Sequence, residues 1–323
     1  MRDNLIDYLG ELKDEINFSF LLLTGDIAHQ GDHYNEEVKK FLNDVLEIID
    51  ISKKDVHIIP GNHDITRDKM RSLIIEGILG SKNASDELDN VDPKTYLGLL
   101  EGQSNFFEFY KGFLGTDYPQ DELHFLKSSE QYNIFSMNTC LISHKKGEEG
   151  HLLIGRKKFY EAIKDMKKLD CENKINIAIG HHTLNCIETS ERNSILANFD
   201  DSKIDIYLSG HVHDPSYNVT INSSASPFFE LTSGAVVSDD YAIPGFVVVD
   251  VDLDNGEAEA CYHIWNTTND YWTVNNQVNR RTKNGKLDFK IERLEKKKEN
   301  QIELIPEDSI DELESADIDE NEF

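Results

Sequence analysis

Four short apolar stretches of this sequence each end at a glycine, and a side chain able to bind a metal ion follows each glycine. The stretches are residues 18–24, 56–60, 175–179 and 204–209, and the motifs after them are Gly25-Asp26, Gly61-Asn62-His63-Asp64, Gly180-His181-His182 and Gly210-His211-Val212-His213. Apolar runs of this length are typical of buried strands, and a glycine lets the backbone turn sharply at the strand end. The sequence therefore predicts a sheet with polar side chains gathered along one edge.

Helical patterns separate these strands. Apolar residues recur at helical spacing in residues 3–16, 34–50 and 156–168. A helix and a strand in alternation, with turn residues at each strand end, indicate an α/β fold. Further strands are expected at residues 132–138 and in the region 217–265, where the turn Asp254-Asn255-Gly256 predicts a hairpin.

Residues 65–125 interrupt this alternation. They are rich in charge and in helical patterning, so we expect a mostly helical insertion within a domain that spans residues 1–275. Its aromatic residues are expected to form the core of the insertion rather than a substrate platform, because aromatic stripes on helices usually pack inward. Residues 276–300 read as a charged extension, with a helix as one interpretation of 286–298, and residues 301–323 as an acidic, disordered tail.

The net charge of −28 on 323 residues limits the kinds of partner. Residues 301–323 hold ten acidic and no basic residues, which leaves −18 for residues 1–300. Such a surface repels nucleic-acid backbones and anionic lipids, so broad non-specific binding to either is disfavoured. It does not exclude one phosphate group held on metal ions, and the acidic tail is a candidate contact for a basic protein partner.

The cysteines and the first residues favour a cytoplasmic protein. Cys140, Cys171, Cys186 and Cys261 form no C-x-x-C pair, and a chain of this length does not need disulfides. The residues after Met1 are amphipathic, unlike a secretory signal. No stretch approaches the ~20 apolar residues of a membrane span.

Each of the four motifs has an ordinary interpretation when taken alone, as a turn, a helix cap or a surface histidine. Together they place Asp, Asn and His side chains at four strand ends, and these groups suit manganese, iron, zinc or nickel. Their order, G-D, G-N-H-D, G-H-H and G-H-x-H over residues 18–265, resembles the calcineurin-like metallophosphoesterases. The resemblance implies a two-sheet β-sandwich flanked by helices in four layers (αββα), with a dinuclear metal centre.

The resemblance also implies roles for single residues. Asp26 resembles the carboxylate that bridges both metal ions, and Asn62, His181 and His211 resemble ligands of the second ion. His213 resembles a ligand of the first ion, and His182 is the less favoured ligand of its pair. His63 resembles the histidine that contacts the phosphate or protonates the leaving group, with Asp64 orienting it. The implied reaction is hydrolysis of a phosphomonoester or phosphodiester with two divalent metal ions, manganese first and iron, zinc or nickel as alternatives.

One part of the family pattern is missing. The pattern begins with a strand that ends in Asp-x-His, which supplies ligands to the first metal ion, and no such motif precedes Asp26. Asp32 and His33 follow Asp26 and are expected in a turn. We therefore expect that the first strand of the sheet is absent and that the chain is a piece of a longer protein. The alternative is a catalytically impaired scaffold or binding module of the same fold.

The substrate is less well indicated than the reaction. Arg67, Lys69 and Arg71 follow the G-N-H-D motif within the insertion, which is expected to cover the site. They could meet the phosphate of a nucleotide or nucleic acid, although a solvated helix face is the favoured interpretation. Residues 262–273, with Trp265, Tyr271 and Trp272, are expected to pack as an edge element or to form a partner surface.

Overall fold

The structure is a computed structural model that describes residues 1–32, 34–145, 147, 149–212, 216–220, 227–236, 243–278 and 282–295. Its helices are α1 (Arg2–Glu15), α2 (Glu36–Ile48), α3 (Lys69–Leu79), α4 (Ala84–Asp89), α5 (Pro93–Leu100), α6 (Ser104–Leu114), α7 (Arg156–Met166) and α8 (Thr189–Asp201). Its strands are β1 (Leu21–Leu23), β2 (Val56–Ile58), β3 (His124–Ser128), β4 (Tyr132–Met137), β5 (Ile175–Gly180), β6 (Ile206–Ser209), β7 (Ser216–Thr220), β8 (Phe228–Thr232), β9 (Gly245–Val251), β10 (Glu257–Asn266), β11 (Tyr271–Val274) and β12 (Lys286–Lys290).

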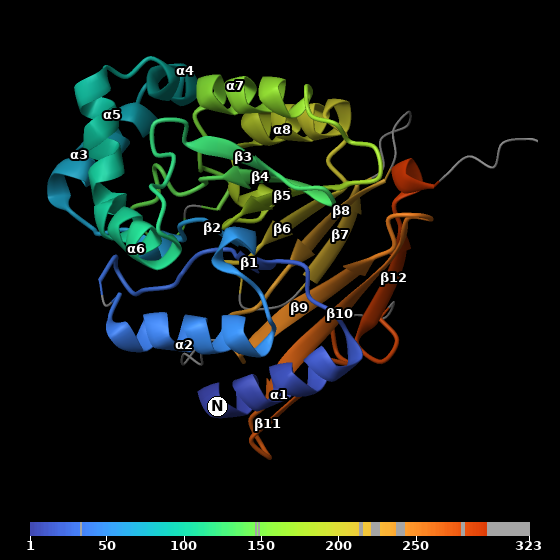
Figure 1. Cartoon of the computed structure of the whole chain (residues 1–323). Coiled ribbons are helices and arrows are strands. Elements are labelled where there is room, and N and C mark those ends of the chain that lie inside the picture. The colour runs from blue at the N-terminus through green and yellow to red at the C-terminus, as the bar shows by residue number, and fades with distance from the viewer. Residues whose placement is uncertain are drawn as a thin grey trace, which may run out of the picture.

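The strands form a sandwich with helices on both outer faces, as predicted (Figure 1). Helices α7 and α8 cover one face of a six-stranded sheet, whose other face packs on the layer that contains β9, β10 and β12. Helices α1 and α2 lie on the far side of that second layer. The mixed α/β architecture and the expected order of layers are therefore confirmed.

The six-stranded sheet has the strand order β3-β4-β5-β6-β8-β7. Its central strands β4, β5, β6 and β8 are parallel, and every residue of these strands is buried. Successive side chains alternate between two cores. Ile177 packs toward the second layer, and Ala178 packs toward α7 and α8. Burial on both faces explains why these strands are continuous apolar runs in the sequence.

The second layer contains a four-stranded sheet in which β10 pairs with β9, β11 and β12. The helix considered for residues 286–298 is wrong at its start, because Lys286–Lys290 forms strand β12 against β10. Leu287 is 7% exposed and Phe289 packs on the same core, whereas the alternate residues Lys286, Asp288 and Lys290 face solvent. This period of two is that of a strand.

Trp265 and Trp272 lie opposite each other on β10 and β11, and both are buried in the core beneath α1. They are therefore not a partner surface, although Tyr271 beside them is exposed.

Strands β1 and β2 form a separate parallel pair. The sequence predicts a buried strand over residues 18–24, but β1 covers only Leu21–Leu23 and its side chains are half-buried. A cavity of about 1910 Å³ lies beside β1 and is lined by residues of both layers and of α1 and α2, which leaves the side chains of β1 incompletely covered.

Residues 69–114 contain helices α3 to α6. Apolar residues of α3, α4 and α5 share a core with the loop after β4, whereas the aromatic residues of α6 pack in the core beneath α1 and α2 and do not form a core within the insertion. Arg71 on α3 corrects one expectation, because it is 1% exposed and lies neither on a solvated face nor at a phosphate site. Its guanidinium donates hydrogen bonds to the carbonyl oxygens of Leu99, Ser143 and Leu141 at 3.0, 2.6 and 2.6 Å. Arg71 therefore fastens the insertion to the loop after β4, a role that depends on residues far along the chain.

We expect His124 on β3 to make the fold sensitive to acid. Burial lowers the pKa of His124 from 6.5 to about 4, its Nε2–H donates to the carbonyl of Ile154 at 2.7 Å, and Nδ1 has no partner. The unfolded chain takes up a proton on this group below about pH 6.5, whereas the folded chain does so only near pH 4. This residue therefore removes about 2 kcal/mol of stability between pH 7 and pH 5.

Urea unfolding of the His124→Gln variant at pH 7 and pH 5 checks this, because glutamine keeps a donor for Ile154 but does not titrate. From pH 7 to pH 5 the free energy of unfolding should fall by about 2 kcal/mol less in the His124→Gln variant than in the parent chain. His151→Gln, at an exposed histidine, serves as the control. An equal loss in all three chains would contradict the assignment.

Candidate metal centre

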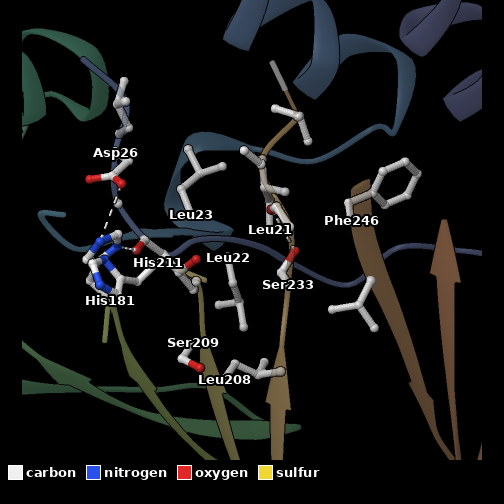
Figure 2. Close-up of a pocket in the computed structure, with 18 of the residues that line it drawn as sticks. Leu21, Leu22, Leu23, Asp26, His181, Leu208, Ser209, His211, Ser233 and Phe246 are labelled. Carbon is white, nitrogen blue, oxygen red and sulfur yellow. Dashed lines mark hydrogen bonds and ion pairs between the residues drawn. The ribbon is translucent and has the colours of Figure 1, made fainter. Parts of the chain in front are cut away.

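Four parallel strand ends carry the side chains singled out in the sequence. β1 leads into Asp26, β2 into Asn62, β5 into His181 and β6 into His211. Parallel strands that end at one edge of a sheet bring the residues that follow them together. Here β1 and β2 belong to one layer of the sandwich, and β5 and β6 belong to the other. The side chains that follow these strands therefore meet between the two layers (Figure 2).

The ligand atoms of these side chains lie close to one another. Oδ1 of Asn62 lies 2.9 Å from Nε2 of His181 and 3.2 Å from Nδ1 of His211. Oδ2 of Asp26 lies 3.4 Å from Nε2 of His181. Adjacent ligands of one ion bound at about 2.1 Å lie roughly 3.0–3.4 Å apart, so this spacing suits a shared metal ion.

The protonation of His181 supports the same interpretation. Its Nδ1–H donates to the carbonyl oxygen of Thr24 at 2.7 Å. In the neutral ring Nε2 then carries a lone pair, and that lone pair faces Oδ1 of Asn62 and the carboxylate of Asp26. Electron-rich atoms facing one another without a hydrogen between them are stabilised by a cation. The residues present therefore fit a divalent metal ion.

The backbone at the centre is unusual. Asp26 and His211 adopt left-handed conformations, with φ of 57° and 67°. Gly25 and Gly61 pack against each other at the same place: a Cβ on Gly25 would lie 2.4 Å from the amide nitrogen of Gly61, and one on Gly61 would lie 2.2 Å from Oδ1 of Asp26. Only glycine permits the two loops to approach this closely.

Burial governs the charge of the histidines. It lowers the pKa of His211 to about 4, and the neighbouring His181 acts in the same direction. Burial also lowers the pKa of His63. Both imidazoles are therefore neutral near pH 7, which is the form that binds metals and that can exchange a proton with a substrate.

His63 lies beside these four side chains and pairs with a residue that the sequence analysis did not single out, His29. Its Nδ1 lies 3.1 Å from Nδ1 of His29, and its backbone amide donates to Oδ1 of Asp26 at 2.8 Å. His29 belongs to the loop after β1, four residues beyond the Gly25 turn. The position of His29 close after the Gly25-Asp26 motif could have indicated a place at the site. The sequence spacing does not indicate that its imidazole contacts that of His63.

Asp64 does not orient His63, in contrast to what the resemblance implies. It is fully buried and accepts hydrogen bonds from the amides of Gly61 at 2.8 Å and Ala28 at 2.9 Å, and from the hydroxyl of Tyr34 at 2.7 Å. Burial and the charge of Asp26 raise the pKa of Asp64 to about 6, although these hydrogen bonds act in the opposite direction. Asp64 holds the loop after β1 on the loop after β2.

His182 lies closer to the centre than expected. His181, His182 and His211 present ligand atoms within 4.8 Å of one another, and the rings of His182 and His211 are 4.5 Å apart. Thr139 fixes His182, because its hydroxyl lies 2.9 Å from Nδ1 and also accepts the backbone amide at 3.2 Å. Burial lowers the pKa of His182 well below its ordinary value, so this ring is neutral as well.

The remaining residues singled out in the sequence lie outside the described residues or away from the four converging side chains. His213 and His33 lie outside the described residues. Asp32 forms an isolated bridge with His29 in the loop after β1. Arg67 and Lys69 are exposed, and Arg67 lines the cavity near His63. No helix in the described part of the chain is long and apolar enough to cross a bilayer.

The sequence matches the calcineurin-like phosphoesterase family over residues 2–215. It is 55% identical over 313 residues to YydB of Bacillus subtilis (strain 168), which is named an uncharacterized metallophosphoesterase-like protein. This match covers 97% of the chain but only 65% of YydB, so the chain spans less than two thirds of that relative's length.

A solved structure shares the fold. Purple acid phosphatase PPD1 from seeds of yellow lupin (Lupinus luteus) superposes with a TM-score of 0.53 at 10% identity, covering 89% of this chain and 49% of the phosphatase. At that identity the likeness concerns the fold alone. Metallophosphoesterase folds typically bind divalent metal ions, and the histidine cluster described above lies where the strand ends meet.

We expect the hydroxyl of Tyr34 to stabilise the two loops of the centre through Asp64. Tyr34→Phe removes one donor to a buried carboxylate and should lower the free energy of unfolding by about 1.5–3 kcal/mol at pH 8, where Asp64 is charged. Tyr160→Phe removes an exposed hydroxyl that contacts Ser194, and should cost less than about 0.5 kcal/mol. Equal losses in urea unfolding would show that the Tyr34–Asp64 contact does not matter for stability.

Proposed function

The chain belongs to the calcineurin-like phosphoesterase family, and on that premise we propose that it hydrolyses a phosphomonoester or phosphodiester at a dinuclear metal centre. The observation that carries the proposal is the convergence of Asp26, Asn62, His181 and His211. Oδ1 of Asn62 lies 2.9 and 3.2 Å from the two imidazoles, and Oδ2 of Asp26 lies 3.4 Å from Nε2 of His181. A carboxylate, an amide oxygen and neutral imidazoles at this spacing are a donor set for a divalent transition metal.

Asn62, His181 and His211 would hold one ion together with Asp26, and Asp26 would be shared with a second ion. The proposed further ligand of that second ion is His213. Manganese is the first choice, with iron, zinc or nickel as alternatives, because all of these accept mixed oxygen and imidazole ligands. Divalent ions, when bound, offset the negative charge of a phosphoester and lower the pKa of a bound water.

His63 is the proposed catalytic residue. One imidazole of the His29–His63 pair donates its Nδ1–H to the other. When His29 is the donor, His63 carries its proton on Nε2 and can donate it to a phosphoryl oxygen or to the leaving group. Such proton donation contributes a factor of about 10²–10⁴ to the rate. The amide of His63 on Asp26 keeps this imidazole next to the metal ligands.

Asp64 acts on catalysis only through position, because its hydrogen bonds come from the loops after β1 and β2 and not from the His63 ring. Arg67, which is exposed and lines the cavity, is the proposed contact for the rest of the substrate, including a nucleotide or nucleic acid. We propose the cytoplasm as the location, in keeping with four cysteines that form no disulfide.

Metal binding is the first expected outcome. Titration of the metal-stripped chain with Mn²⁺, followed by calorimetry or by metal analysis after gel filtration, should show at least one ion bound per chain. Asn62→Ala should weaken the affinity about 10–100-fold, since it removes the oxygen at the middle of the ligand set. Asn193→Ala, at an exposed position on α8, is the matched control. Equal affinities for the two variants would contradict the assignment of Asn62.

Hydrolysis of a phosphoester is the second expected outcome. The manganese-loaded chain should hydrolyse bis(4-nitrophenyl) phosphate or 4-nitrophenyl phosphate. His63→Asn should lower kcat by about 10²–10⁴ and leave the manganese affinity unchanged, because His63 is not a proposed ligand. His151→Asn should match the parent chain in both measurements. Metal binding without turnover in the parent chain would instead favour the catalytically impaired scaffold.

A further inference from the structure

His182 is an imidazole of the candidate metal centre to which the proposed reaction gives no role. It is 1% exposed, it lines the cavity beside β1 together with His181 and His211, and the centroid of its ring lies 4.5 Å from that of His211. Burying an imidazole costs free energy unless its polar atoms find partners. The surroundings of its two ring nitrogens therefore indicate what this residue does.

Three contacts fix His182 in place. Its backbone amide donates to the hydroxyl oxygen of Thr139 at 3.2 Å, and its carbonyl oxygen accepts from the hydroxyl of Tyr207 at 2.6 Å. Its Nδ1 lies 2.9 Å from the same Thr139 oxygen. Tyr207 lies on β6, the strand that leads to His211, so this strand holds both imidazoles. These contacts leave the His182 ring little freedom to turn.

The hydroxyl of Thr139 decides where the proton of the His182 ring lies. A threonine hydroxyl has one hydrogen to donate and two lone pairs that accept. One lone pair accepts the His182 amide, and within the described residues this hydroxyl, which is buried, has no partner other than His182. Its hydrogen is satisfied only when it is donated to Nδ1, because otherwise it would be buried without an acceptor. Nδ1 of His182 is therefore the acceptor of this contact.

Cys140 does not reverse that assignment. Its Sγ lies 3.8 Å from Nδ1 of His182, but its S–H is directed at the carbonyl oxygen of Pro60 at 3.3 Å, and sulfur is a weak acceptor. A neutral ring that accepts at Nδ1 carries its proton on Nε2. Among the described residues Nε2 of His182 has no hydrogen-bond partner, and it is the ring nitrogen left to face the cavity.

We propose that His182 is a hydrogen-bond donor to the substrate, with its Nε2–H directed at a phosphoryl oxygen of the phosphoester, and that Thr139 is the positioning residue that keeps the proton on Nε2. This inference rests on the proposed phosphoesterase function. It gives two adjacent histidines opposite tautomers and different tasks.

The partner of each Nδ1 accounts for the difference. The carbonyl oxygen of Thr24 can only accept, so His181 donates its Nδ1–H and presents a lone pair on Nε2. The hydroxyl of Thr139 can donate, so His182 accepts at Nδ1 and presents a proton on Nε2. One ring is therefore suited to a metal ion, and the other is suited to an anion.

The place of this donor suits a phosphoester. A ring nitrogen of His182 lies within 4.8 Å of the ligand atoms of His181 and His211. A fixed N–H in a site with little water stabilises negative charge on an oxygen more strongly than water does. Because the ring is neutral, it adds no positive charge that would repel the metal ions. His182 thus complements the proposed ligands without competing with them.

The first measurement locates the ring proton without metal or substrate. Nitrogen NMR of the full chain, labelled in its histidine rings, is recorded at pH 8, and the His182→Gln chain identifies the signals of His182. We expect the proton on Nε2. Thr139→Val keeps the shape of the side chain but removes the hydroxyl, so the proton should move partly to Nδ1. Thr139→Ser retains the hydroxyl and should keep the proton on Nε2.

The second measurement is calorimetry of inorganic phosphate binding to the manganese-loaded chain. His182→Gln and His182→Asn form a matched pair, because the amide of glutamine reaches the place of Nε2 whereas that of asparagine reaches only the place of Nδ1. His182→Asn should weaken phosphate binding about 10–100-fold, since it removes a hydrogen bond to a charged group. His182→Gln should weaken it far less, and both variants should keep the Mn²⁺ affinity of the parent chain.

Four results would overturn the inference. A proton on Nδ1 in the parent chain would do so whether or not the chain is a phosphoesterase. Equal phosphate binding by the parent chain and His182→Asn would do so while the proposed function stands. A loss of Mn²⁺ affinity in His182→Asn would make His182 a metal ligand instead. A parent chain with the proton on Nε2 that binds neither Mn²⁺ nor phosphate would contradict the proposed function, and the role of His182 toward a substrate with it.

Discussion

The buried carboxylate of Asp64 is the contact on which the candidate metal centre depends. It accepts hydrogen bonds from the loop after β2 and from the loop after β1, and so brings together Gly61 and Ala28, which come from different strands. A carboxylate without solvent is stabilised only when such donors surround it. These hydrogen bonds also position Asp26 and Asn62. Asp26 lies in the loop after β1 and Asn62 in the loop after β2, and Asp64 connects the two loops.

The features that could be predicted from the sequence are those that depend on residues close together in the chain. A strand, its terminal glycine and the polar residue after it are neighbours in the chain, so the sequence alone predicts the strand ends and the four residues that converge there. The family and the layered fold follow from the same motifs and are confirmed. The ligand roles themselves remain proposals.

What could not be predicted depends on partners far along the chain. The guanidinium of Arg71 meets carbonyls 28 to 72 residues away, and the Asp64–Tyr34 contact spans 30 residues. Helical patterning alone places Arg71 on a surface. Strand β12 was missed for a similar reason, since its five residues become a strand only against the edge of β10. Local propensity is a weak guide where tertiary pairing decides the conformation.

The left-handed backbone at Asp26 and His211 lowers the stability of the fold at the two residues whose side chains converge between the layers. An L-residue pays a steric penalty in that conformation, whereas glycine adopts it freely. Glycine at either position would relax the backbone but would remove a carboxylate or an imidazole from the group that converges between the layers. The most stable sequence for these two turns is therefore not the one that can hold a metal ion, and selection for robustness alone would erode the site.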